Sequence, residues 1–288
     1  MLTLCLLSVS DCTPPEVCVP RESHLGFFSK GDCILTDAEY FQGHEWITFF
    51  ANEDLKEEVR FSKDELQAIA EGNRRTDWPK EMLVHMNSGP LIYVQRLTKY
   101  TNEPENQRMH FLLSDKNTSQ EAAADSLEKI RALTRESGET WLKNPERALT
   151  LAGQATHIIQ DSFSTAHTVR DFDDGWCIQS VKAYLRRADG FATSDIEYHG
   201  RPDGGEVGHA TVEDSIYLES NACQKPEGRD NIEDCFNETA TRARLGTMEY
   251  LTLLDEVFKN KADESDTSEE ELDIALEGFF KDHFSFCE

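Results

Sequence analysis

The sequence predicts an all-α fold, and three observations support that prediction. Apolar residues recur at helical spacing along most of the 288-residue chain. Strand-like alternation is scarce, and residues 89–97 are the best candidate for a strand. Helix start and stop signals flank several of the apolar runs. No apolar run reaches the roughly eighteen residues that a membrane-spanning helix needs, so we expect no transmembrane segment.

The first four predicted helices lie before residue 164. Residues 36–39, Thr-Asp-Ala-Glu, resemble a capping box that opens a helix over residues 38–55. A short helix is predicted over residues 62–72, with Gly72 as its end. A long helix follows over residues 119–142. Pro145 begins the next one, over residues 145–163, because a first-turn proline has no N–H group to leave unpaired.

Further helices are predicted over residues 176–188, 205–220 and 237–260. The acidic segment 260–271 leads to an amphipathic helix over residues 269–284, which we expect to dock onto the rest rather than form a second domain. The chain then has three parts. They are an N-terminal segment, 1–35, whose apolar start could belong to a leader peptide, a helical domain, 36–258, and an acidic linker with a C-terminal helix, 259–288.

The formal net charge of −26 is the strongest compositional feature. A surface this acidic repels nucleic acid polymers and is not drawn to anionic membranes by electrostatics. It suits a protein that collects divalent cations, although solubility explains most of these carboxylates equally well. Nucleic acid is therefore not expected as a partner.

Eight cysteines are present, and none forms a C-x-x-C pair, which argues against a thiolate zinc knuckle. Cys223 and Cys235 could close one loop as a disulfide, and Cys18 and Cys33 could close another. An even number of cysteines favours an oxidising compartment, with buried free thiols as the alternative. We therefore expect a secreted or periplasmic protein.

The segment "THIIQDSFSTAHTVRD", residues 156–171, contains three side chains that commonly bind metals. His157 and Asp161 are four residues apart and lie on one helical face, the spacing that two ligands of one cation need. His167 follows six residues later and is out of phase, so the helix must end or bend near Ser164. These residues fit either a metal site or a buried core histidine beside a capping aspartate.

Other segments favour the metal interpretation. His44 lies within the first long helix, Asp77 precedes a proline turn, and His110 precedes the helix over residues 119–142. His209 and Glu213 are again four residues apart. Helices that supply inward-facing histidines and carboxylates are a common architecture for polynuclear metal sites.

The order of these residues resembles the zinc-dependent phospholipase C family, whose clan also contains fungal single-strand nucleases. The resemblance covers roughly residues 36–258, and the H-x3-D-x5-H pattern from His157 to His167 is its most specific element. "GHEWITFFA", "RTDWP" and "MHFLLSD" resemble the family segments that carry a ligand histidine, a ligand aspartate and a histidine–aromatic pair. The resemblance implies a helical bundle of the phospholipase C type that binds two to three zinc ions.

The resemblance also implies which residues hold each ion. The first zinc is implied for Asp77, His110, His157 and Asp161. The second is implied for His167, His209 and Glu213. The third is implied for His44, with the carboxylate of Asp161 bridging two ions.

The chain departs from the family pattern in two places. The family usually has proline where this chain has Thr165, and its mature N-terminal tryptophan, a ligand of the third zinc, has no counterpart here. His24 is the substitute candidate for that ligand, with an exposed loop histidine as the alternative. His199 and Asp203 compete with the pair His209 and Glu213 for the second zinc; the latter pair is preferred because it lies on a predicted helix.

The activity that the resemblance implies is phosphodiester hydrolysis. The expected enzyme is a phospholipase C that cleaves a glycerophospholipid, such as phosphatidylcholine, to diacylglycerol and a phosphoalcohol during transient contact with a membrane surface. Asp77 is implied as general base besides its ligand role. Phe163, Trp78 and Phe111 could meet the lipid, with core packing as the default for each. Two alternatives stay open: a single-strand nuclease or nucleotidase, and a non-catalytic helical protein that a metal stabilises.

Overall fold

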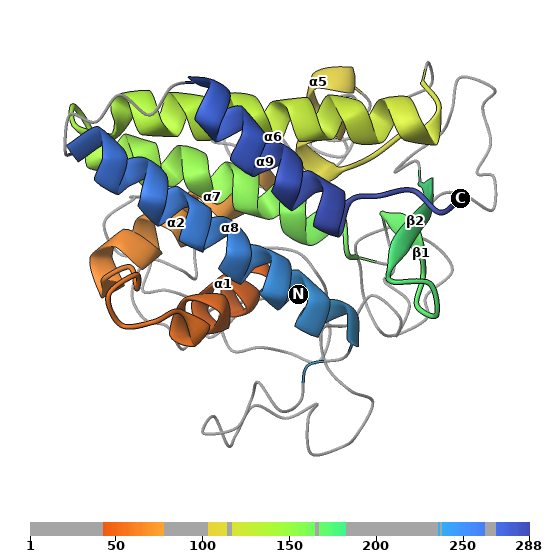
Figure 1. The fold of residues 1–288 in the computed structure, drawn as a ribbon, viewed down its shortest axis with the longest axis horizontal. Helices are drawn as coiled ribbons and strands as arrows, with labels where there is room; N and C mark the ends of the chain where they lie inside the picture. Colours follow the sequence, from red (N-terminus) through yellow and green to blue (C-terminus); the bar gives the residue numbers. More distant parts are fainter. Residues whose placement is uncertain are drawn as a thin grey trace, which may run out of the picture.

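The computed structural model describes residues 43–77, 103–113, 117–164, 167–182, 236, 238–262 and 269–288. These ranges are mostly helical and contain one two-stranded sheet, which Figure 1 shows beside the C-terminus. The predicted all-α class is confirmed for this part of the chain. None of the helices described there is long and apolar enough to cross a membrane.

Most of the predicted helices are present, with small differences at their ends. The helices are α1 (Gly43–Asp54), α2 (Lys63–Asp77), α5 (Pro104–Gln107), the 3-10 helix η5 (Arg108–His110), α6 (Ser119–Trp141), α7 (Pro145–Asp161), α8 (Glu238–Ala262) and α9 (Glu269–His283). The predicted helix over 205–220, the strand over 89–97 and the capping box at 36–39 lie outside the described residues.

Local signals start α6 and α7. Thr118 caps α6 by accepting a hydrogen bond from the amide of Glu121, whose carboxylate accepts one from the Thr118 amide. This reciprocal pair is a capping box. Asn144 caps α7 through its side chain, and Pro145 occupies the first turn as predicted.

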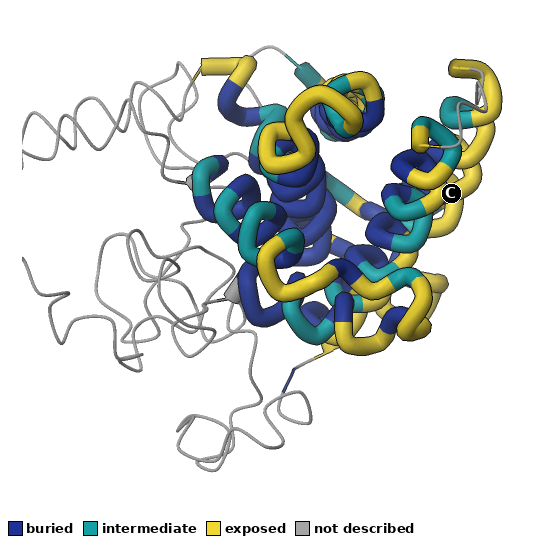
Figure 2. The backbone as a smooth tube through the Cα atoms, turned by 90° about the vertical axis from the view of Figure 1, so that its left-hand side faces the viewer, coloured by how far each residue is buried: buried dark blue, intermediate teal, exposed yellow. Residues whose placement is uncertain are grey.

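Helix α7 is the centre of the bundle. Nearly all of its residues from Ala148 to Asp161 are buried, and it packs most extensively on α2 and α6. Figure 2 shows the buried backbone gathered in the interior, with exposed segments around it. Because α7 ends at Asp161, its last turn carries a carboxylate into the protein interior.

The prediction that Gly72 ends its helix is wrong, because α2 continues to Asp77. Gly72 instead lies where α2 crosses α7. A Cβ atom on this residue would lie 2.0 Å from the carbonyl oxygen of Thr150. The glycine is therefore explained by close helix packing rather than by helix termination.

The helix predicted over residues 176–188 is also wrong where the structure describes it. Residues Thr168–Asp171 form β1 and Cys177–Val181 form β2, an antiparallel pair in which Thr168 lies opposite Val181. Gly175 and Trp176 have positive φ angles of 64° and 67°, which no right-handed helix accommodates. A short apolar run cannot be assigned to helix or strand by periodicity alone, and here the pairing decides.

The C-terminal segment joins the main body of the protein. Leu276, Phe279 and Phe280 of α9, with Phe284 just after it, belong to the main hydrophobic core. A disulfide between Cys177 and Cys287 then links the end of the chain to β2. The sequence did not predict this disulfide, and the pairs that it did suggest lie outside the described residues. The division of the chain at residues 35 and 258 stays a prediction.

Candidate metal centre

Four histidines surround the carboxylate of Asp161 in the interior of the bundle. Oδ1 lies 3.1 Å from Nε2 of His44 and 3.6 Å from Nε2 of His167. Oδ2 lies 3.0 Å from Nε2 of His157 and 3.1 Å from Nδ1 of His110. Each carboxylate oxygen therefore faces two imidazole rings, and all five residues are buried.

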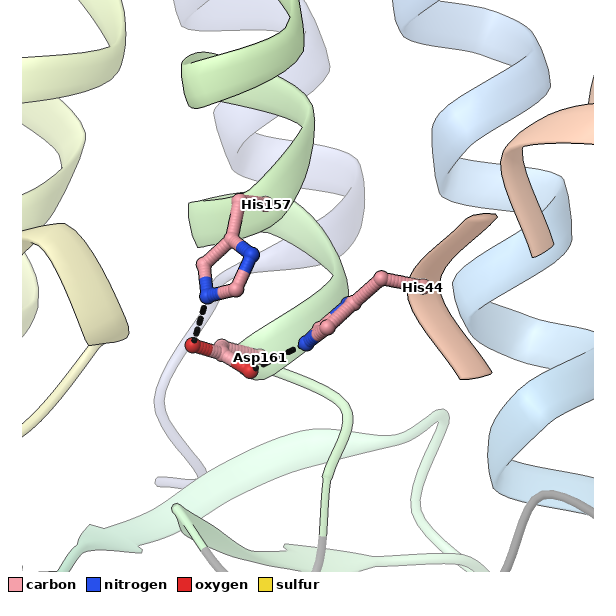
Figure 3. A group of neighbouring side chains, drawn as sticks. All are labelled: His44, His157 and Asp161. Carbon is pink, nitrogen blue, oxygen red and sulfur yellow. Dashed lines mark ion pairs between the residues drawn. The ribbon is translucent and has the colours of Figure 1, made fainter. Parts of the chain in front are cut away.

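Separate elements bring these histidines together. His44 comes from α1, His110 ends η5, and His157 lies one turn before Asp161 on α7. Figure 3 shows His44 and His157 approaching the two oxygens of Asp161 from different helices. One ligand atom each from His44, His157 and Asp161 lies within 4.8 Å of the other two, so this group could hold a metal ion.

The end of α7 explains the position of His167. The chain turns through Ser162 and Ser164, and the amide of His167 donates to the carbonyl of Ser164 at 3.0 Å. The Thr168 hydroxyl then donates to the carbonyl of Ser162 at 2.7 Å, which ties the start of β1 back to the helix end. The predicted end of the helix near Ser164 is thus confirmed, and His167 returns to the same carboxylate.

His110 is followed by an unusual backbone conformation. Phe111 has φ 50° and ψ 48°, in the left-handed region that residues other than glycine rarely adopt. Its ring is fully buried and stacks on Phe284 at 5.7 Å between ring centroids. Burial of this ring offsets the backbone strain, and the turn separates the buried His110 from the start of α6.

The electrostatics of the site keep Asp161 ionised. Burial by itself would raise the pKa of Asp161, but electrostatic attraction to the rings of His157, His167 and His44, together with a hydrogen bond from His110, holds it well below its usual value. Burial lowers the pKa of His167 to about 4, so this ring is neutral at physiological pH. An ionised carboxylate and a neutral imidazole are the protonation states that bind metals.

A second layer of polar side chains lies behind the histidines. Nδ1 of His44 lies 2.7 Å from Oε1 of Gln160, and Nδ1 of His157 lies 2.8 Å from Oδ1 of Asn73. Gln160 and Asn73 also bond to the hydroxyl of Thr48, at 2.8 and 3.3 Å. We call Thr48, Asn73 and Gln160 the amide network; all three are fully buried.

The amide network was missed by the sequence analysis. The signal that could have revealed it is a buried polar residue one turn from a predicted ligand. Thr48 lies four residues after His44, and Gln160 lies three residues after His157. Such positions are on the same helical face as the ligand, where an apolar residue is usual.

Several predicted site residues are not tested by this geometry. Asp77 is the last residue of α2, one turn beyond Asn73, and its side chain is not described. The others that lie outside the described residues are His24, His199, Asp203, His209, Glu213, Thr165 and Trp78. Phe111 and Phe163 are buried in the hydrophobic core, so core packing is confirmed for both and the suggestion that they meet a lipid is wrong for the protein as described.

Comparison with known proteins gives no relative. No protein-family model matches the chain, and searches of curated proteins and of solved structures found no match either.

Proposed function

We propose that this chain is a zinc-dependent phosphodiester hydrolase whose substrate is a glycerophospholipid, cleaved to diacylglycerol and a phosphoalcohol. One observation carries the proposal: His44, His110, His157 and His167, from separate parts of the fold, converge on the buried carboxylate of Asp161. The phospholipase C pattern in the sequence requires this convergence. A set of core histidines packed independently would not share one carboxylate.

The spacing of the donor atoms supports zinc. His110 Nδ1, His157 Nε2 and Asp161 Oδ2 form a triangle with sides of 3.1, 3.0 and 3.1 Å. Tetrahedral zinc with ligands at about 2.0–2.1 Å separates neighbouring ligand atoms by roughly 3.3–3.4 Å. The triangle is thus close to one face of such a tetrahedron. Imidazole nitrogen and carboxylate oxygen are also the donors that zinc commonly binds.

The arrangement around Asp161 supports more than one ion. Oδ2 serves the pair His110 and His157, while Oδ1 faces His44 and His167. A carboxylate that presents one oxygen to each pair can bridge two cations. We propose two to three zinc ions: one held by His110, His157 and Asp161 Oδ2, one held by His44 at Asp161 Oδ1, and one held by His167 together with His209 and Glu213, which lie beyond the described residues.

Bound zinc would neutralise the charge on the phosphate oxygens and make a water molecule acidic enough to attack phosphorus at neutral pH. The protein contributes the rest of the site. The buried histidines and Asp161 exclude bulk solvent from the ligand cluster, which strengthens the electrostatic interactions there. Asp77, at the end of α2, is the proposed base that takes the proton of the attacking water.

Two further observations bear on the substrate and its location. The net charge of −26 disfavours a long polynucleotide, because each phosphate contact normally needs a basic partner. The disulfide between Cys177 and Cys287 supports an oxidising compartment, either the periplasm or the extracellular space. A short-chain phosphatidylcholine is therefore the first substrate to test.

The test measures zinc content and hydrolysis on the same samples. Zinc is quantified by mass spectrometry, and phosphocholine release is followed with a short-chain phosphatidylcholine. We expect Asp161→Asn to lose zinc and turnover together. His283→Ala is the matched control, because His283 pairs with Glu249 and is not one of the four histidines beside Asp161, so it should keep both.

The outcomes separate the proposal from its alternatives. Turnover of single-stranded DNA without turnover of phosphatidylcholine would identify a nuclease. Bound zinc without turnover of either substrate would identify a metal-stabilised protein without catalysis. Normal zinc and full turnover in Asp161→Asn would overturn the metal assignment itself.

A further inference from the structure

We propose that Asn73 and Gln160 are positioning residues, which hold the rings of His157 and His44 in the one tautomer that can bind a cation beside Asp161. The inference rests on the proposed function, since it assigns both amides to a metal centre. It concerns residues that touch neither the carboxylate nor a substrate. Their effect would act entirely through the two histidines.

The hydroxyl of Thr48 determines how the two amides are oriented. Its single proton is donated to the carbonyl of His44, at 2.9 Å. The hydroxyl oxygen can therefore only accept from the groups that approach it, at 2.8 Å from Gln160 and 3.3 Å from Asn73. Both amides must present their NH2 groups to Thr48.

The histidine tautomers follow from that orientation. With the NH2 groups on Thr48, the amide oxygens of Gln160 and Asn73 face Nδ1 of His44 and His157. An amide oxygen only accepts, so each Nδ1 must carry the proton. In a neutral ring the lone pair is then on Nε2, the atom that faces Asp161 in both histidines.

The two halves of this arrangement support each other. Nδ2 of Asn73 also donates to Oε1 of Gln160 at 3.1 Å, and Nε2 of Gln160 donates to Thr247 of α8 at 3.2 Å. Flipping either amide would place like groups opposite one another at several buried contacts. Through Gln160 and Asn73, the helices α1, α2 and α8 thus contact the last turn of α7. These contacts hold the rings of His44 and His157, which would bind the cations.

Variants that keep or remove the acceptor provide the first test. Gln160→Met and Asn73→Leu remove an acceptor with little change in volume, and each should weaken Zn²⁺ affinity about 10- to 100-fold in a chelator competition. Gln160→Glu keeps an acceptor for His44 Nδ1 and should keep affinity within a few-fold of wild type, although an added buried carboxylate lowers stability. If Gln160 had only a structural role, Gln160→Met would keep more of the Zn²⁺ affinity than Gln160→Glu.

Asn52→Leu is the matched control. Asn52 is a buried amide on α1 that bonds to both backbone groups of Phe61, at 3.1 and 2.9 Å, outside the histidine cluster. It should lose stability and keep wild-type Zn²⁺ affinity. Equal affinities in Asn73→Leu, Gln160→Met and wild type would overturn the proposal.

Nuclear magnetic resonance on wild-type protein with ¹⁵N-labelled histidine gives a test that needs no variant to fold. His44 and His157 should be protonated at Nδ1, both without metal and with Zn²⁺. Absence of the Nδ1 proton from either ring in the metal-free protein would overturn the inference. A protein that binds Zn²⁺ and hydrolyses nothing would refute the proposed function and leave this tautomer result standing.

Discussion

Replacing Gly153 by alanine would place a methyl group where α7 lies against the backbone of α2. The new Cβ would lie 1.9 Å from the carbonyl oxygen of Ile69 and 2.8 Å from the amide nitrogen of Asn73. These two backbone groups are four residues apart, so within α2 they form a helical hydrogen bond. The methyl group would enter that bond directly.

The size of the effect follows from this overlap. Carbon and oxygen atoms that are not bonded lie about 3.3 Å apart or more, so α2 and α7 must separate by more than about 1 Å. Overpacking of this kind costs about 1–3 kcal/mol and sometimes more, and the higher helix propensity of alanine returns about 1 kcal/mol. Separation also stretches the hydrogen bond from His157 to Asn73. Loss of that buried hydrogen bond adds about 1–3 kcal/mol, so we expect the free energy of unfolding to fall by about 1–5 kcal/mol in all.

The assay is urea unfolding followed by circular dichroism, with Gly278→Ala as the matched control. Gly278 lies on the exposed side of α9, and a Cβ atom there would meet nothing within 4 Å. Alanine at that position should raise stability by about 0.5–1 kcal/mol. If Gly153→Ala were as stable as Gly278→Ala, the close approach of α2 and α7 would be refuted, and with it the contact of Asn73 and His157.

Three further predictions address other parts of the fold. Cys177→Ser removes the disulfide to Cys287, which joins residues 110 positions apart in the sequence. It should lower the free energy of unfolding by about 2–5 kcal/mol, measured by urea unfolding with and without reductant. Burial raises the pKa of Tyr250, so its stabilising contribution is complete below about pH 10 and is lost as the pH rises further. Tyr250→Phe should therefore flatten the decline that we expect in unfolding midpoints above about pH 10; an unchanged decline would contradict this. Arg170 donates to the carbonyls of Ser162, Trp176 and His283, and Arg170→Met should cost about 3–5 kcal/mol in thermal or urea unfolding because these buried oxygens lose a charged donor. Wild-type stability of this variant would show that the guanidinium does not hold the hairpin to the helix ends.

Much of the fold was readable from local pattern. Helices over residues 119–142, 145–163, 237–260 and 269–284 agree with α6, α7, α8 and α9 because apolar periodicity and capping residues act within the helix itself. The two errors have a different origin. Gly72 is explained by the backbone of α7, and residues 177–181 form a strand because they pair with residues 168–171 and with the C-terminal segment.

The candidate site divides in the same way. The spacing of His157 and Asp161 was enough to place both on one helical face, and it left a metal site and a buried core histidine as alternatives. His44 and His110 could be assigned to the site only through a family resemblance. Their distances to Asp161 depend on how α1 and η5 pack against the end of α7, which no local pattern specifies.

By itself, the sequence determined the helical class, most helix positions and the shared helical face of His157 and Asp161, because these depend on periodicity and residue chemistry. Tertiary structure alone decided the hairpin, the Cys177–Cys287 link and the amide network behind His44 and His157. The physical reason is that these contacts join residues far apart in the sequence. The hydrogen bond between Asn73 and His157 forms only when α2 and α7 pack backbone to backbone, and the one between Gln160 and Thr48 forms only when α1 packs against α7.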